Sequence, residues 1–203
     1  GRADDAISTL RSKINTSPSD AEAHNLLCRV YFSLGDWDRG ISACEKAVAL
    51  DPNNSRYHMW LGRIYGEKAD AANFLSAASL AGKVHNEFEA AVRLDPNNVE
   101  ARSDLGEFYL EAPGIVGGGR DKAEAQAQAL AALDSAKADY LKGRLAEKRK
   151  DFATAETEYR AAIEASHGSP PTWCNLALFF PHREPRNALD EAITPAVPAP
   201  AQP

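Results

Sequence analysis

The sequence is poor in cysteine, has no excess of positive charge and contains no long apolar run. Its three cysteines, Cys28, Cys44 and Cys174, have a spacing that matches neither a zinc finger nor a redox motif. The 23 Lys and Arg residues are outnumbered by 29 Asp and Glu residues, so the net charge of −6 provides no attraction for a nucleic-acid backbone. Stretch 71–84 is interrupted by several polar residues, including Lys83, and is too short to span a bilayer. These absences argue against nucleic-acid binding and against membrane insertion.

Apolar residues make up 44% of the chain and charged residues 26%, which is enough apolar material for a buried core. The sequence begins at Gly1, and no charged and apolar leader precedes the first predicted helix. We therefore expect a fragment or a processed form from which any targeting signal is missing. The oligomeric state and the full-length domain context stay open at this point.

Two internal repeats organise the chain. The string AVALDPNN at 47–54 returns as AVRLDPNN at 91–98, and each copy closes an amphipathic stretch. The string LGRIY at 61–65 similarly returns as LGEFY at 105–109. A fixed period of this kind indicates a repeat architecture, in which each unit buries its apolar face on the next.

The segment 21–54 resembles the tetratricopeptide repeat, a helix-turn-helix unit of about 34 residues. A Gly-Asp-Trp turn at 35–37 separates its two predicted helices, and Asp51-Pro52 ends the second. His24 stands in the usual tryptophan slot and Gly40 in the usual alanine slot, and neither departure breaks the register. The matching apolar and small residues are Leu27, Cys28 and Tyr31 on the first helix and Cys44 and Ala47 on the second.

This resemblance extends over most of the chain and implies an all-α fold, a right-handed α-solenoid of tetratricopeptide helix-turn-helix units. We expect a single solenoid over 1–193, followed by a disordered Pro/Ala tail at 194–203. The expected parts of the solenoid are a lone second helix at 3–20, repeats at 21–54, 55–98, 99–135 and 136–169, and a degenerate last repeat at 170–193.

Two departures from the repeat length stand out. The alanine-rich segment 67–83 predicts lengthened helices in the second unit, with Phe74, Leu75 and Leu80 packed on each other or on a neighbouring unit. Together with the glycine-rich turn at 113–122, this insert resembles a subgroup of bacterial tetratricopeptide proteins, many of which are exported. The resemblance favours an exported or periplasmic location, with the cytoplasm as the alternative.

His24, Cys28 and Cys44 are candidates for a metal site, because the first two share a helix face and the repeat brings the third across from them. All three occupy core slots, and a structural zinc normally takes four ligands. Packing of the two cysteines as buried thiols is therefore the favoured interpretation, with a Cys28–Cys44 disulfide and a metal as alternatives. His58 repeats the His24 slot and is expected to pack in the same way.

Neither a phosphate site nor a catalytic constellation emerges from the sequence. The glycine-rich turn follows a predicted helix and leads into Arg120 and Asp121, whereas a phosphate loop follows a strand and ends in Lys-Ser/Thr. We expect it to be a flexible, lengthened turn. No set of nucleophile and base is tied to a recognisable turn. We accordingly expect no enzyme, no cofactor and no bound metal.

A stripe of side chains at i, i+4 and i+7 on each first helix is predicted to face the concave side of the solenoid. The alternative is a solvated helix face with no partner. The predicted groove residues are Asn25, Arg29, Phe32, Met59, Arg63, Ser103, Glu107, Leu110, Tyr140 and Arg144.

The heat-shock-chaperone-binding members of the family hold a terminal carboxylate on this surface, but Trp60 and Asp104 leave that clamp incomplete here. We expect a non-catalytic scaffold whose groove binds another protein, through a peptide with acidic and apolar residues at one end. A recruiting or regulatory domain of a larger enzyme or of a secretion or envelope assembly is the alternative.

Overall fold

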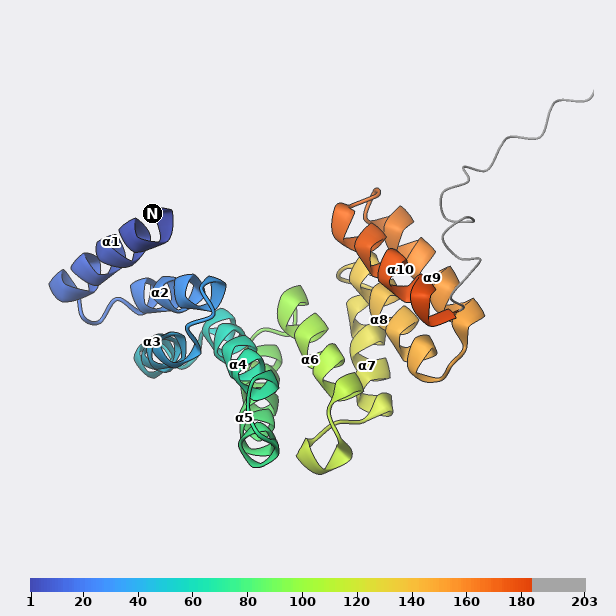
Figure 1. Cartoon of the computed structure of the whole chain (residues 1–203), viewed down its shortest axis with the longest axis horizontal. Coiled ribbons are helices and arrows are strands. Elements are labelled where there is room, and N and C mark those ends of the chain that lie inside the picture. Colours follow the sequence, from blue (N-terminus) through green and yellow to red (C-terminus); the bar gives the residue numbers. More distant parts are fainter. Residues whose placement is uncertain (184–203) are drawn as a thin grey trace, which may run out of the picture.

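The computed structural model describes residues 1–183, which form an elongated row of helices from α1 to α10 without a β-strand (Figure 1). The predicted unit at 170–193 ends outside these residues, and the predicted tail at 194–203 lies wholly outside them. The helices are α1 (Arg2–Thr16), α2 (Ala21–Ser33), α3 (Trp37–Leu50), α4 (Ser55–Asp70), α5 (Phe74–Leu94), α6 (Val99–Glu111), the short 3₁₀ helix η1 (Gly114–Val116), α7 (Arg120–Leu130), α8 (Ser135–Lys148), α9 (Phe152–Ala165) and α10 (Pro170–Arg183).

Helix boundaries follow local chemistry. The side chains of Asp20, Asp36 and Asn98 each accept a hydrogen bond from the backbone N–H three residues later, which caps the starts of α2, α3 and α6. Helices α3 and α5 end at Leu50 and Leu94, each directly before an Asp-Pro pair. Proline cannot continue a helix, so the repeated Asp-Pro pairs separate one helical pair from the next.

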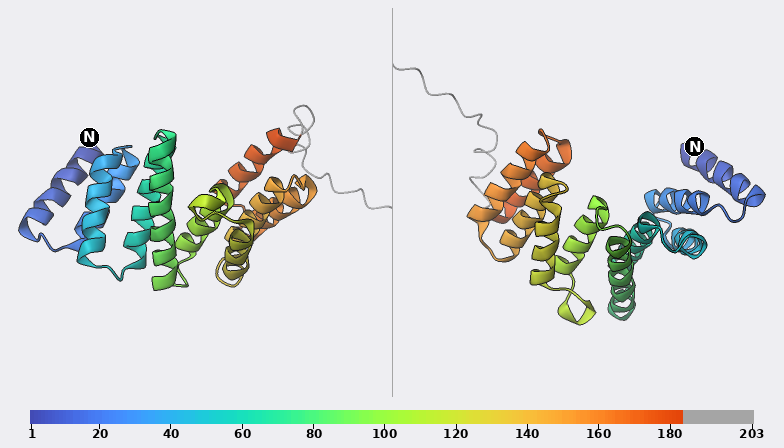
Figure 2. Two further views of the ribbon diagram at one scale, coloured as in Figure 1. Left: turned by 90° about the horizontal axis from the view of Figure 1, so that it is seen from below. Right: turned by 180° about the vertical axis from the view of Figure 1, so that it is seen from behind.

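The helices pack as antiparallel pairs, α2 with α3, α4 with α5, α6 with α7 and α8 with α9, and each pair contacts the next (Figure 2). Close approach depends on glycine. A Cβ atom on Gly40 would lie 2.1 Å from Cδ1 of Ile64, and one on Gly62 would lie 2.6 Å from the ring of Phe88. The close approach of Ile64 explains why glycine, and not the usual alanine, stands at position 40. The expectation of an all-α repeat solenoid is confirmed.

Cys28 and Cys44 form a disulfide that joins α2 to α3, with their Cα atoms 5.2 Å apart. Both residues are fully buried in the main hydrophobic core, as expected from their slots. The favoured interpretation as two free thiols is wrong, because the helical pair brings the two Cα atoms to a separation that suits a disulfide. The bond also takes up both sulfur atoms that the metal alternative required.

The hairpin between α4 and α5 ends in exposed apolar side chains. Phe74 and Leu75 are 85% and 80% exposed, whereas Leu80, further along α5, packs partly against the core. The expectation that Phe74 and Leu75 pack on each other or on a neighbouring unit is therefore wrong. Helix α5 has 21 residues, and the residues of its first turn, 74–76, are exposed.

The glycine-rich turn after α6 is tied to its surroundings. The Gly119 N–H donates to the Tyr109 carbonyl at 2.8 Å, and the Gly118 N–H donates to the Pro113 carbonyl at 3.2 Å. Gly117 has a φ of +103°, and a Cβ atom there would lie 3.0 Å from the His85 ring of α5. The turn, which we expected to be flexible, is thus held against α5. None of the helices within residues 1–183 has the length and apolar character that a bilayer crossing requires.

Candidate interaction surface

Helices α2, α4, α6 and α8 are the first helices of successive pairs, and each contacts the next directly as well as its own partner. They form one continuous side of the array, which we call the first-helix surface. All ten predicted groove residues belong to these four helices. The structure divides them into exposed groups, groups tied to each other by ion pairs, and buried groups.

An aromatic cluster around Trp60 occupies the α2–α4 part of the first-helix surface. The guanidinium carbon of Arg29 lies 5.0 Å from the centre of the Trp60 ring, and that of Arg63 lies 4.9 Å from it. Phe32 meets Trp60 edge-on, with ring centres 5.5 Å apart. Three predicted residues therefore gather around a tryptophan that the sequence analysis did not include among them. Each helix carries an arginine and an aromatic residue three positions apart, and this spacing is visible in the sequence. The contact between the two helices is not visible there.

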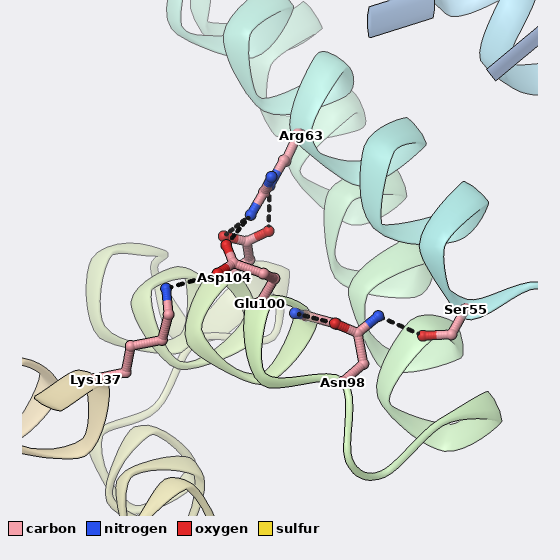
Figure 3. A network of polar contacts seen from close by, with 7 residues as sticks. Ser55, Arg63, Asn98, Glu100, Asp104 and Lys137 are labelled. Carbon is pink, nitrogen blue, oxygen red and sulfur yellow. Dashed lines mark hydrogen bonds and ion pairs between the residues drawn. The ribbon is translucent and has the colours of Figure 1, made fainter. Parts of the chain in front are cut away.

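Arg63 joins a network of charged groups that links α4, α6 and α8 (Figure 3). Its Nε donates to Asp104 at 2.5 Å and its Nη2 donates to Glu100 at 2.9 Å, while Lys137 Nζ lies 2.9 Å from Glu100. Burial opposes the charge of Arg63, but the hydrogen bonds to the two carboxylates outweigh it and raise the pKa of Arg63. Burial also raises the pKa of Asp104, despite the opposing effect of Arg63. The Arg63 charge is thus neutralised within the chain.

Arg29 differs from Arg63 in this respect. Its side chain is exposed, and within the described part of the chain its recorded contact is the Trp60 ring, with no carboxylate in ion-pair range. An exposed guanidinium held over an aromatic ring keeps its donors available to a ligand. Arg29 is therefore an exposed cation at this end of the surface, without a recorded ion pair among the described residues.

Tyr140 and Arg144 lie one turn apart on α8 and contact each other. Arg144 Nη1 donates to the Tyr140 hydroxyl at 3.0 Å, and its Nη2 donates to Glu111 of α6 at 2.5 Å. Glu107 of α6 is paired less closely, since its carboxylate lies 4.0 Å from Arg144 Nη1. Burial by the surrounding helices raises the pKa of Glu107, although the charge of Arg144 opposes this effect.

Two adjacent hollows open on the α6–α8–α10 part of the surface and share Tyr140 and Asn175. The larger has a volume of about 450 Å³ and includes Ser103 and Glu107 in its lining. The smaller, of about 190 Å³, lies beside Arg144. Of the predicted residues, Ser103, Glu107, Tyr140 and Arg144 are brought together here, away from the Trp60 cluster.

Four predicted groove residues are buried, namely Asn25, Met59, Ser103 and Leu110. Met59 packs with Ala91 and Ala101, and Leu110 belongs to the main core, so neither offers the exposed apolar anchor that we expected. The reason is geometrical. Each first helix is flanked by its own second helix and by the next first helix, so the stripe open to solvent is narrower than a helical repeat of i, i+4 and i+7 suggests.

Histidines and acids elsewhere on the helices have structural contacts. His24 Nε2 lies 3.2 Å from the Pro18 carbonyl, and His58 occupies the corresponding slot with Nε2 2.9 Å from the Pro52 carbonyl. His58 Nδ1 also lies 2.6 Å from Glu87, and this hydrogen bond raises the pKa of His58. Among the described residues, no group of three or more His, Cys, Asp or Glu side chains is arranged to hold a metal ion.

Comparison with known families decides the assignment. Two family models described as tetratricopeptide repeat match residues 1–64 and 116–170. The chain belongs to the tetratricopeptide repeat family. Cellulose synthase operon protein C of Escherichia coli K12 is 37% identical to it over 60 residues, which are 30% of this chain and 5% of that protein. The matched segment thus spans a small fraction of the curated relative.

Solved structures share the arrangement of this tetratricopeptide repeat protein. TTC0263 of Thermus thermophilus aligns with a TM-score of 0.72 at 22% identity, over 88% of this chain and 91% of its own. MamA of Desulfovibrio magneticus RS-1 aligns with a TM-score of 0.63 at 19% identity, over 84% and 89%. The human IFIT1 dimer with m7Gppp-AAAA aligns with a TM-score of 0.72 at 18% identity, over 85% and 40%. At these identities the likeness shows the fold alone. The tetratricopeptide repeat fold supports a protein–protein interaction scaffold in general terms.

Proposed function

We propose that this tetratricopeptide repeat protein binds an extended or helical segment of a partner protein on its first-helix surface and does not itself catalyse a reaction. The Trp60 cluster is the observation that carries the proposal. It combines a half-buried indole, the edge of Phe32 and an exposed guanidinium from Arg29 without a carboxylate partner among the described residues. Aromatic and arginine side chains of this kind are enriched among residues that dominate binding energy.

The chemistry of the cluster favours a ligand with an acidic residue next to an apolar one. The acidic residue would pair with Arg29, while the apolar residue would cover Trp60 and Phe32. An exposed ion pair contributes only about 0–1 kcal/mol, so the apolar contact would provide most of the affinity. The charge would determine which residue of the ligand lies against α2.

The test is a binding titration with a fluorescein-labelled synthetic peptide that carries glutamate and leucine residues at one end. We expect binding that weakens by about tenfold in Trp60→Ala and to a smaller extent in Arg29→Glu. Lys46→Glu is the matched control, because Lys46 is an exposed cation on the second helix α3. Equal affinity of wild type, Trp60→Ala and Arg29→Glu would show that the binding surface lies elsewhere.

A second candidate is a recruiting or regulatory domain of a larger protein. This candidate is favoured by the match to cellulose synthase operon protein C, which is 37% identical over 60 residues. The matched segment is only 5% of that protein, so a similar repeat there is part of a much longer chain. The full-length reading frame distinguishes the two candidates. A catalytic domain in the same reading frame would support recruitment, whereas a chain of helical repeats alone would support the scaffold.

A further inference from the structure

We propose that the hollow between α6, α8 and α10 binds a lysine or arginine side chain of the partner segment, with the Glu107 carboxylate as its main acceptor. The proposal deepens the proposed function and rests on it for the source of the side chain. It assigns opposite ligand charges to the two ends of the first-helix surface. An acidic residue would bind at Arg29, and a basic residue would bind at Glu107.

Three helices supply the walls of the hollow, and each contributes a polar side chain. Ser103 and Glu107 are one turn apart on α6, so both point to the same side of that helix. Tyr140 comes from α8 and Asn175 from α10, and these two residues line both hollows. A ligand side chain entering here would meet oxygen and nitrogen atoms from three directions.

Several of these groups have no hydrogen-bond partner within the part of the chain that the structure describes. Ser103 is 6% exposed and its hydroxyl makes no hydrogen bond there, and the same is true of the Asn175 amide. Both residues line the larger hollow, so these unpaired groups are free to bond a ligand or water there. The hydroxyl and the amide can each accept a hydrogen bond from an ammonium or guanidinium group.

Glu107 stands apart from the other acids of this surface. Asp104 and Glu100 pair with Arg63, Glu111 pairs with Arg144 and Lys148, and Glu147 accepts from the Tyr159 hydroxyl at 2.7 Å. The closest recorded cation to Glu107 is Arg144 at 4.0 Å, and Arg144 directs its short hydrogen bonds to Tyr140 and Glu111 instead. Glu107 therefore keeps its acceptor capacity, and with 40% of its side chain exposed it remains accessible.

The surrounding charges favour a cation over an anion. The two cations that line the hollows, Lys137 and Arg144, are each held by an acid of α6 outside the lining, Glu100 and Glu111. The lining acids are Glu107, Asp134 and Glu147, so acids outnumber bases at the site itself. The Tyr140 ring, over which the Arg144 guanidinium lies at 6.0 Å from the ring centre, adds an apolar wall that suits the alkyl stem of a lysine.

The test uses Nα-acetyl-lysine N-methylamide as the probe and its norleucine analogue as the uncharged match, each titrated into the ¹⁵N-labelled full chain and followed by NMR. We expect the lysine derivative to bind in the millimolar range and to shift amide signals of α6, α8 and α10. The norleucine derivative should leave them in place. Equal responses to the two derivatives would overturn the proposal.

Variants then assign the site. Glu107→Gln should weaken binding of the lysine derivative by about tenfold, because a charged hydrogen bond is lost. Glu158→Gln is the matched control, since Glu158 also lies 4.0 Å from a cation, Lys142, but lines a different hollow. Unchanged affinity in Glu107→Gln, or an equal loss in Glu158→Gln, would count against the site.

Asn175→Ala is a second variant of the hollow, to be used if Glu107→Gln does not fold. It should weaken binding by about threefold, and wild-type affinity in this variant would also count against the site. The outcome is separable from that of the proposed function. Loss of the acidic peptide in Arg29→Glu without any lysine binding would leave the scaffold intact and reject only this site.

Discussion

Asn25 is a fully buried side chain on α2 whose amide nitrogen and oxygen have no hydrogen-bond partner among the described residues. Leaving such groups unpaired costs about 1–3 kcal/mol. We expect Asn25→Leu, which fills a similar volume with apolar atoms, to raise the free energy of unfolding by about 1–3 kcal/mol. Urea denaturation measures the change, with Asn25→Ala as the control that leaves a cavity. A loss of stability in Asn25→Leu would contradict the prediction.

His58 predicts a pH dependence of stability. Its hydrogen bond to Glu87 raises its pKa in the folded state, so the protonated imidazole stabilises the fold. This contribution is fully present below the ordinary histidine value of about 6.5, and it is lost as the pH rises through the raised value. We expect wild type to lose stability relative to His58→Gln as the pH rises from about 6.5 through the raised pKa of His58. A constant difference in unfolding free energy over this range would rule out the linkage.

At the residue scale, the helical spacing predicted a stripe on each first helix but could not separate its exposed members from its buried ones. Arg29 and Phe32 lie on the surface cluster, whereas Met59 and Leu110 are in the core. All four satisfy the same helical spacing. Their burial depends on how far each first helix is rotated about its axis toward its neighbours. The few residues of one helical turn do not allow that rotation to be predicted.

Gly62 allows α4 and α5 to approach each other closely. Gly66, on the same helix, lies in open space and serves as the control position. A Cβ atom at Gly62 would lie 2.6 Å from the Phe88 ring, whereas one at Gly66 would meet nothing within 4 Å. We expect Gly62→Ala to destabilise the protein by about 1–3 kcal/mol through overpacking. Gly66→Ala should instead stabilise it by roughly 0.5–1 kcal/mol, because alanine favours the helix. Thermal unfolding compares the two, and equal effects would refute the packing argument.

The Cys28–Cys44 disulfide closes a short loop between α2 and α3, with a sequence separation of 16. A loop of this length stabilises a fold by about 3 kcal/mol, chiefly by restricting the unfolded chain. We therefore expect Cys28→Ala/Cys44→Ala to lower the free energy of unfolding by about 3 kcal/mol in urea denaturation. Cys174→Ser should leave it unchanged, because Cys174 is exposed and outside the bond. An unaltered double variant would show that the bond does not form in solution.

The helices and their pairing were the features that the sequence predicted best. The Asp-Pro pairs and the Asp and Asn caps mark helix ends by local chemistry, so the helices and their pairing follow from short strings. The disulfide did not follow from them. Two cysteines 16 residues apart on facing helices are compatible with free thiols as well as with a bond, and the sequence does not specify the Cα separation of 5.2 Å that permits the bond.

Residues 1–183 contain two large hydrophobic clusters. One runs from Leu27 to Leu145, and the other joins the end of α8 to α9 and α10 around Tyr159. In a repeat array each unit is stabilised mainly by contacts with its adjacent units. The effect of a core substitution should therefore be largest in its own cluster. We expect Tyr159→Ala, which costs roughly 2–5 kcal/mol as a core truncation, to speed amide hydrogen exchange in α9 and α10 far more than in α2 to α5. Uniformly faster exchange would indicate one cooperative unit.

The internal pairing of Arg63 with Asp104 and Glu100 has a consequence for how a partner would be recognised. Because the middle of the first-helix surface is neutralised within the chain, Arg29 on α2 and Glu107 on α6 remain as charges of opposite sign at different places along it. Under the proposed function, a segment with one acidic and one basic residue would satisfy both charges in one orientation, whereas the same segment turned end for end would bring like charges together. The two charges would therefore determine which way round a bound segment lies along the helices.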